Sequence, residues 1–116
     1  MRDYLWPMQP RRPRHSDPAR VRDLAVAALR AGVCLRFTYS GRARLAEVHA
    51  VGLSTAGRED MSTWQIAGDS ESGRIPGWRT FCLDECFDVE LSDVPSLAPR
   101  PDFKPGDGFA RIDAQV

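Results

Sequence analysis

The string GDS ends at Ser70 and precedes a nucleophilic serine in some hydrolases, so catalysis is the first chemistry to test. A serine nucleophile needs a base within hydrogen-bond reach and an acid that orients the base. His49 is the only histidine of the predicted folded body, and Asp69 or Asp84 could orient it. However, GDSESG departs from the GDSGG of chymotrypsin-like proteases, and the chain has no GxSxG elbow. We therefore predict that Ser70 is a turn residue and that the protein is not an enzyme.

Thiols and imidazoles are the next candidates, because they ligate metals. Cys34, Cys82 and Cys86 are odd in number and lie in apolar or alternating stretches, which favours reduced, mostly buried thiols over disulfides. Three residues separate Cys82 from Cys86, unlike the spacing of a CxxC redox or zinc motif, and His15 and His49 are the only histidines. Glycine-rich phosphate loops of Walker or Rossmann form are absent from the sequence. We expect neither a metal nor a cofactor.

A set of cationic, amide and aromatic residues in or beside predicted strands carries more information. Its members are Tyr39, Arg44, His49, Gln65, Trp78 and Arg79. Two arginines with an amide and aromatic rings suit a phosphate or carboxylate ligand that has a planar group to stack. The alternative for each residue is structural: the aromatic rings pack in the core, and the arginines pair with acids on neighbouring strands.

These residues depend on a helix and several short strands for their positions. Asp17 or Ser16 as N-cap, Pro18 at the first helical position and Gly32 after the end predict a helix. From Val33 the apolar period changes to two, which predicts strands. The predicted strands span residues 33–39, 42–54, 62–70, 78–84 and 87–93.

The fold class that follows is mainly β. We expect a small SH3/Sm-like antiparallel β-barrel of about five strands preceded by one α-helix, occupying residues 16–95. Prolines and glycines break residues 96–116 into an irregular C-terminal tail packed on or near the barrel, with a short extended piece at residues 110–116. Residues 68–77 supply the turn that contains Ser70.

Residues 1–15 are rich in proline and arginine and show no helix or strand period, so we predict a flexible N-terminal arm. Arg11, Arg12 and Arg14 on this arm are candidate nucleic-acid contacts. Charge is uneven along the chain: residues 1–58 hold eleven arginines and four acids, whereas residues 59–116 hold five basic residues and twelve acids. Without a long apolar run or a signal peptide, we expect a cytoplasmic protein that does not enter membranes.

Four segments resemble the WYL domain, an Sm/SH3-like barrel of bacterial regulators. LRFTYSG resembles its first strand, ending at Tyr39, and RLAEVHAVGL resembles its R-x-V-E-P-H/L-x-L segment through Arg44, Glu47 and His49. TWQIAG stands at the W-Y-L tripeptide, with Gln65 in place of the tyrosine. WRTFCLDECFDVEL resembles the family's R-x-F-x-L-D segment, which is the most specific of the four. The chain is therefore similar to short, stand-alone bacterial WYL-like proteins.

The resemblance implies a ligand-sensing, regulatory module for transcription or defence. Family members are thought to bind a nucleotide-like or nucleic-acid ligand and to regulate an attached or associated module. One helix cannot form a helix-turn-helix, so we expect regulation in trans, through a protein partner and a nucleotide or oligonucleotide ligand. Two alternatives remain open: binding of single-stranded nucleic acid through the basic arm, and a structural adaptor, compatible with a homo-oligomer, that assembles through barrel edges.

Overall fold

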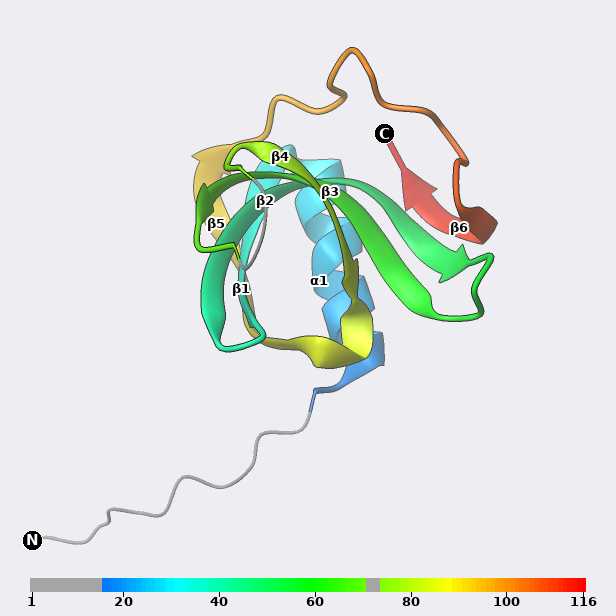
Figure 1. Ribbon diagram of the computed structural model, residues 1–116, viewed down its shortest axis with the longest axis horizontal. Helices are drawn as coiled ribbons and strands as arrows, with labels where there is room; N and C mark the ends of the chain where they lie inside the picture. Colours follow the sequence, from blue (N-terminus) through cyan, green and yellow to red (C-terminus); the bar gives the residue numbers. More distant parts are fainter. Residues whose placement is uncertain (1–15, 71–73) are drawn as a thin grey trace, which may run out of the picture.

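The computed structural model describes residues 16–70 and 74–116 of the 116-residue chain. One helix precedes a mainly β architecture, and the described residues form six strands (Figure 1). The elements are α1 (Pro18–Ala31), β1 (Val33–Tyr39), β2 (Arg42–Ser54), β3 (Glu59–Gly68), β4 (Gly77–Cys82), the short 3-10 helix η1 (Leu83–Glu85), β5 (Cys86–Pro95) and β6 (Phe109–Gln115). Residues 1–15, including the predicted arginine arm, lie outside the described residues.

Helix α1 begins and ends where its capping residues predict. The Asp17 side chain accepts a hydrogen bond from the Arg20 backbone N–H at 3.3 Å, and Pro18 occupies the first turn. Gly32 ends the helix in the left-handed conformation, with φ of 72°. Val21, on the buried face of the helix, packs against the sheet. The predicted helix is therefore confirmed.

The strands pair antiparallel in the order β4-β3-β2-β1-β5, and β6 pairs with β2. Strand β2 is long enough to pair with β1 through its first residues and with β6 through its last. The mainly β class is confirmed, but the sheet is not closed and has six strands rather than about five. The additional strand is β6, where the sequence predicts only a short extended piece. Its hydrogen bonds are made with β2, and this long-range pairing cannot be recognised from the local sequence.

The sheet has an inner face, which packs on α1, and an outer face. Buried apolar side chains from β1–β5 and η1 join those of α1 to form the hydrophobic core. Its sheet and η1 members are Leu35, Phe37, Ala46, Val48, Val51, Met61, Phe81, Leu83 and Cys86. A register shift in β2 between Val48 and Ala50 lets both Val48 and Val51 reach this core. His49, between them, belongs to the outer face.

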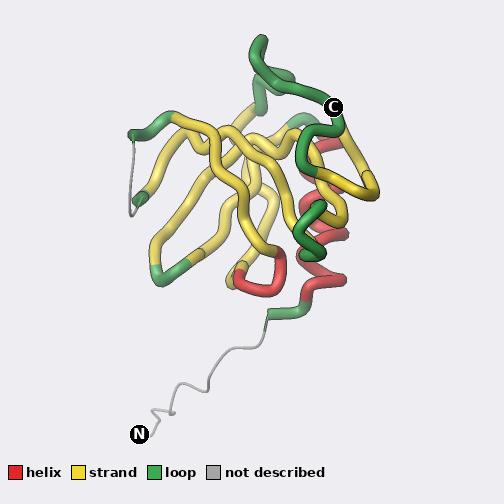
Figure 2. The backbone as a smooth tube through the Cα atoms, turned by 45° about the vertical axis from the view of Figure 1, so that its right-hand side comes forward, coloured by secondary structure: helices red, strands yellow, loops and turns green. Residues whose placement is uncertain are grey.

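The outer face is crossed by residues 96–108, which we call the strap. The strap connects the end of β5 to the start of β6. In Figure 2 it is part of the green loop near the label C. The strap contains turns and irregular backbone among the described residues, and it contacts the outer face through Arg100 and Phe103. Among the described residues, no helix has the length and apolarity needed to cross a bilayer.

Candidate functional site

The structure divides the six predicted binding residues between the two faces of the sheet. Strand register places Gln65 and Arg79 on the face of Met61 and Phe81, which is the inner face. Trp64 and Trp78 are paired directly across β3 and β4 on the outer face, where His49 also lies. The residues therefore form two separate regions rather than a single concave site.

The first region, which we call the arginine end, comprises Tyr39, Arg44, Gln65 and Arg79. Arg44 is 4% exposed and donates hydrogen bonds to the Tyr39 carbonyl at 3.1 Å and to Gln65 Oε1 at 3.4 Å. Its guanidinium carbon also lies 5.7 Å from the Tyr39 ring centroid and 5.5 Å from that of Phe81. These contacts are cation–π and hydrogen-bond interactions within the chain, so the Arg44 guanidinium stabilises the fold where it lies.

The other two members of the arginine end hold the β3–β4 loop. Gln65 is fully buried, and its Nε2 donates to the carbonyls of Ala67 at 3.0 Å and Asp69 at 2.9 Å. The Arg79 guanidinium donates to the carbonyls of Trp78 at 2.7 Å and Arg74 at 2.8 Å. Both side chains thus complete backbone hydrogen bonds that an irregular loop leaves unmade.

Ser70 lies in this loop, after β3 ends at Gly68 and before β4 begins at Gly77. Its Oγ accepts a hydrogen bond from Arg79 Nη2 at 3.1 Å. A hydroxyl that accepts from a guanidinium is not activated as a nucleophile by that contact, because activation needs a base that takes the hydroxyl proton. The turn position predicted for Ser70 is the one observed.

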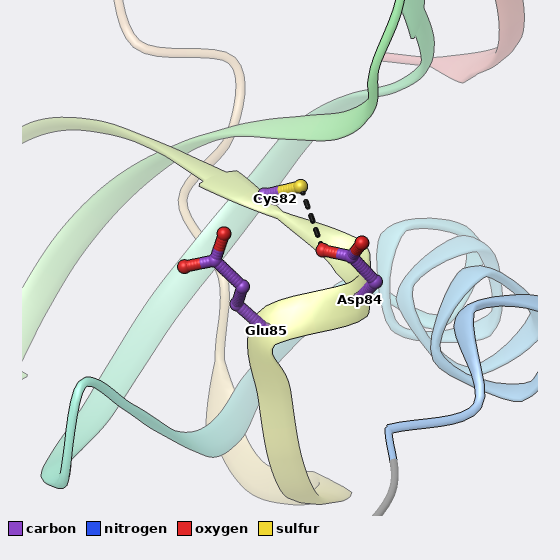
Figure 3. A group of neighbouring side chains, drawn as sticks. All are labelled: Cys82, Asp84 and Glu85. Atoms are coloured by element: carbon purple, nitrogen blue, oxygen red, sulfur yellow. Dashed lines mark hydrogen bonds between the residues drawn. The ribbon is translucent and has the colours of Figure 1, made fainter.

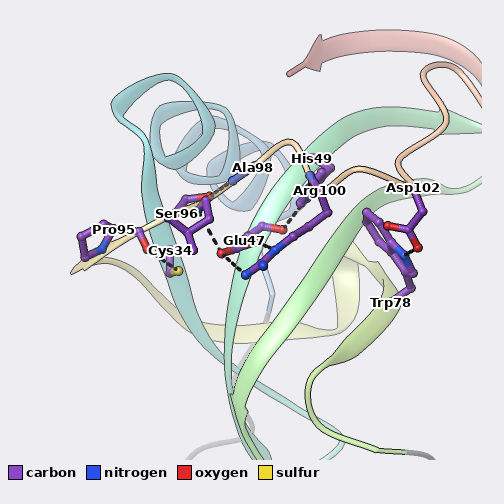
Figure 4. A network of polar contacts seen from close by, with 10 residues as sticks. Cys34, Glu47, His49, Trp78, Pro95, Ser96, Ala98, Arg100 and Asp102 are labelled. Carbon is purple, nitrogen blue, oxygen red and sulfur yellow. Dashed lines mark hydrogen bonds and ion pairs between the residues drawn. The ribbon is translucent and has the colours of Figure 1, made fainter.

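His49, the base that a serine mechanism would require, is fully buried beneath the strap. Its Nε2 accepts a hydrogen bond from the Arg100 backbone N–H at 3.0 Å (Figure 4). Because Nε2 accepts, the ring proton lies on Nδ1, which donates to the Glu47 carbonyl at 3.1 Å. Burial lowers the pKa of His49 below its ordinary value of 6.5, so the neutral ring is favoured.

Glu47 and Arg100 attach the strap to the sheet beside His49. Glu47 is 1% exposed, and its carboxylate accepts from Arg100 Nε at 2.8 Å and Arg100 Nη2 at 2.9 Å. The Leu97 backbone N–H donates to the same carboxylate at 2.9 Å. Figure 4 shows these contacts crossing from the strap to β2. A bidentate pair with a buried carboxylate fixes the position of the strap as well as its orientation.

Beside this attachment, the strap and the outer face enclose a groove of about 590 Å³, which we call the strap groove. Trp78, Phe103 and Phe109 supply its aromatic surface, and the Trp78 and Phe103 rings are stacked with centroids 6.1 Å apart. Ser62 and Thr80 supply hydroxyls from the sheet. A groove of this volume with apolar walls and a few polar groups has the ordinary properties of a small-molecule site.

The strap groove also contains a buried carboxylate, Asp60, on β3. Asp60 is 2% exposed and lies on the same face of the strand as Ser62, two residues along. Its Oδ2 contacts Arg58 Nη2 at 3.4 Å, whereas Oδ1 has no hydrogen-bond partner among the residues that the structure describes. Burying an unsatisfied charged oxygen costs free energy, so this atom is poised to accept a hydrogen bond.

A second acidic group, Cys82 with Asp84 and Glu85, lies at the corner between β4 and η1 (Figure 3). The Cys82 thiol donates to Asp84 Oδ1 at 2.9 Å, and burial raises its pKa to about 11. Burial likewise raises the pKa of Cys34 to about 11 and that of Cys86 to about 12. All three cysteines are buried and free, which confirms the expected absence of disulfides, and their protonated forms are poor nucleophiles and ligands.

Of the predicted binding residues, only Trp78 lines the strap groove, and the sequence analysis missed Asp60, Asp102 and Phe103. A predicted strand that began at Glu59 instead of Ser62 would have placed Asp60 on the face of Trp64. The local sequence of the strap does not indicate a binding role for Asp102 and Phe103, because these residues reach the sheet through tertiary contacts. Comparison with known proteins adds nothing to this site: no family model, curated protein or solved structure matches the chain.

Proposed function

We propose that the protein is a non-enzymatic binding module, an open SH3/Sm-like sheet of WYL type, that takes a small organic ligand in the strap groove. The observation that carries this proposal is the groove itself, with about 590 Å³ between a sheet and a strap. Aromatic rings give such a ligand a stacking surface, and the hydroxyls and carboxylates orient it.

The chemistry of the described residues favours binding over catalysis. Both ring nitrogens of His49 are engaged by backbone groups, so neither is directed at a substrate. Ser70 accepts a hydrogen bond from Arg79, and the cysteines have raised pKa values. Within residues 16–70 and 74–116 we therefore assign no nucleophile–base pair.

The strap provides a means for a bound ligand to act on a partner. The groove has one wall on the sheet and another on the strap, so a ligand between them stabilises the docked strap by mass action. A partner that contacts the strap would then sense the ligand. This mechanism is regulation in trans, which the WYL resemblance implies.

A second candidate keeps the anionic ligand that the resemblance implies, a nucleotide or oligonucleotide at the arginine end. The observation in its favour is that the exposed residues Arg42 and Arg74 lie at the same end of the sheet as Arg44 and Arg79. Arginines so gathered attract phosphate groups. This candidate predicts that nucleotides stabilise the protein and that Arg42→Ala with Arg74→Ala removes the effect.

A thermal-shift screen with two matched variants tests the lead proposal. Thr80 is exposed and lines the groove, so Thr80→Trp should fill it; Thr38→Trp places the same side chain on β1, away from the groove lining. Amines, neutral polyols and nucleotides are the probes. A compound that stabilises wild type and Thr38→Trp but not Thr80→Trp supports the proposal. If no probe distinguishes the two variants, the strap groove is not the binding site.

A further inference from the structure

The buried Oδ1 of Asp60, which has no hydrogen-bond partner among the described residues, allows a deeper inference about the ligand, which rests on the proposed function of the strap groove. A buried carboxylate oxygen with no partner among the described residues requires a donor, and it repels any ligand group that can only accept. Phosphates and carboxylates are acceptors at neutral pH. Asp60 therefore selects against the anionic ligands that suit the arginine end.

The other charged residues of the groove also favour a cationic ligand. Asp60, Asp102 and Asp107 line it, opposed by Lys104 alone among the lining residues, while Arg58 reaches Asp60 Oδ2 from a largely exposed position. Asp102 Oδ2 accepts from Trp78 Nε1 at 2.8 Å, so this carboxylate is already oriented by the aromatic wall. The lining thus carries an excess of negative charge next to an indole ring.

An indole face beside carboxylates is a favourable environment for an organic cation. A positive group above an aromatic ring gains electrostatic attraction from the ring quadrupole, and tryptophan is the best of the aromatic residues for this. The same cation can donate hydrogen bonds to Asp60, which a neutral polyol would do more weakly because its donors are uncharged. Trp78 lies four residues along β4 from Cys82, which pairs with Asp60, so the charge-assisted hydrogen bond and the cation–π attraction act at different points of the strap groove.

We propose that the strap groove binds a small organic cation, with an amino or guanidino group, whose N–H donors bind the Asp60 carboxylate and whose remainder extends along the groove toward Trp78. The ligand bridges β3 and β4 to the strap, with the cation at the sheet and the remainder against Phe103. Specificity comes from two features together: the buried oxygen that accepts a donor, and the aromatic wall that accommodates charge.

Titration calorimetry with agmatine and putrescine tests this inference, using methyl glucoside as a neutral probe and AMP as an anionic one. Asp60→Asn keeps the shape of the side chain but removes its charge, and Asp93→Asn, at an exposed position of β5, is the matched control. We expect an amine to bind wild type and Asp93→Asn equally. Asp60→Asn should weaken that binding by about tenfold or more, since a charge-assisted hydrogen bond is lost.

The outcomes separate this inference from the proposed function. If methyl glucoside or AMP binds with sensitivity to Thr80→Trp while neither amine binds, the groove is a ligand site and the cation is wrong. Amine binding that is unchanged by Asp60→Asn also overturns the cation site. If no probe binds in a manner sensitive to Thr80→Trp, the proposed function and this inference fail together. A circular dichroism spectrum and melting curve for each variant confirm that it is folded.

Discussion

The arginine end and the strap groove both include residues of β2, β3 and β4, yet their charged groups have different surroundings. At the arginine end, Arg44 and Arg79 donate to carbonyls, an amide and a hydroxyl of the chain itself. In the strap groove, Asp60 Oδ1 is buried without a partner among the described residues. A buried polar atom without a hydrogen bond among the described residues occurs in each region, at Arg44 Nε and at Asp60 Oδ1. Arg44 has other contacts within the chain and does not line the groove, whereas Asp60 does, so the Asp60 oxygen is the one that indicates a ligand.

The same contrast separates two kinds of arginine at one end of the sheet. Arg44 is buried and bonded on several sides, and Arg42, two residues earlier in β2, is exposed. From the sequence, Arg44, and not Arg42, is selected as a cation available to a phosphate. Burial makes Arg44 a structural residue, because a guanidinium that leaves its contacts removes a donor from the buried Gln65 Oε1 and from the part-buried Tyr39 carbonyl.

The largest effect should therefore come from Arg44→Ala, which tests whether this residue is structural. The buried Gln65 Oε1 and the part-buried Tyr39 carbonyl lose a donor and the arginine stem leaves a void, so the free energy of unfolding should fall by about 2–4 kcal/mol. Urea unfolding measures the change. Arg42→Ala is the control and should alter stability by less than about 0.5 kcal/mol. Equal effects of the two substitutions would remove the distinction between buried and exposed arginines.

Glu47→Gln should have the next largest effect, because it weakens the attachment of the strap. The buried carboxylate accepts three hydrogen bonds, two of them from the Arg100 guanidinium, and an amide replaces charge-assisted bonds with weaker ones. We expect a loss of about 2 kcal/mol in the free energy of unfolding. Hydrogen exchange should also accelerate in residues 97–108, which would show that the strap opens locally.

Glu90→Gln provides the matched control for the strap. Glu90 pairs with Arg36 at 3.7 Å, and its side chain is 64% exposed, so its ion pair is largely screened by solvent. We expect no measurable change in stability or in exchange of the strap. Unchanged hydrogen exchange of residues 97–108 in Glu47→Gln would mean that the Glu47–Arg100 pair does not hold the strap on the sheet.

The two regions also differ in how far the sequence predicts them. Helix α1 and strand β2 follow from capping and alternation, because Asp17, Pro18 and the apolar period are local signals. Trp78 could be selected as an aromatic residue on a strand, but its partner Asp102 is 24 residues away. The strap groove depends on the path of an irregular segment and on β6 pairing, which are long-range features that neither period nor composition specifies.

A fall in pH should lower the stability of the protein through His49, which lies beneath the strap and not at the arginine end. The pKa of His49 is lowered by burial in the folded protein, whereas the unfolded chain has the ordinary value of 6.5. Between these two values the unfolded state binds the proton and the folded state does not, so stability falls as pH drops below the unfolded value. Wild-type protein should lose stability from about pH 7.5 to about pH 5.5, as measured by urea unfolding.

Comparison of wild type with two histidine variants tests whether His49 is responsible for this pH dependence of stability. His49→Gln cannot take up the proton, so its stability should change less over the same range, although its stability at neutral pH is lower. His15→Gln serves as the control, because it removes the other histidine of the chain and should retain the wild-type slope. The same slope in wild type and His49→Gln would show that another group carries the pH dependence.

Ser70→Ala should give the smallest effect and returns to the chemistry that the GDS string suggests. The Ser70 hydroxyl accepts a hydrogen bond from Arg79, a side chain that also bonds to the carbonyls of Trp78 and Arg74. Its loss should lower the free energy of unfolding by less than about 1 kcal/mol, since the guanidinium keeps its carbonyl partners. Ligand binding in the strap groove should be unchanged, because Ser70 is not among the groove lining. A Ser70→Ala variant that loses ligand binding would instead connect the β3–β4 loop to the groove, and the two regions would then form one functional unit.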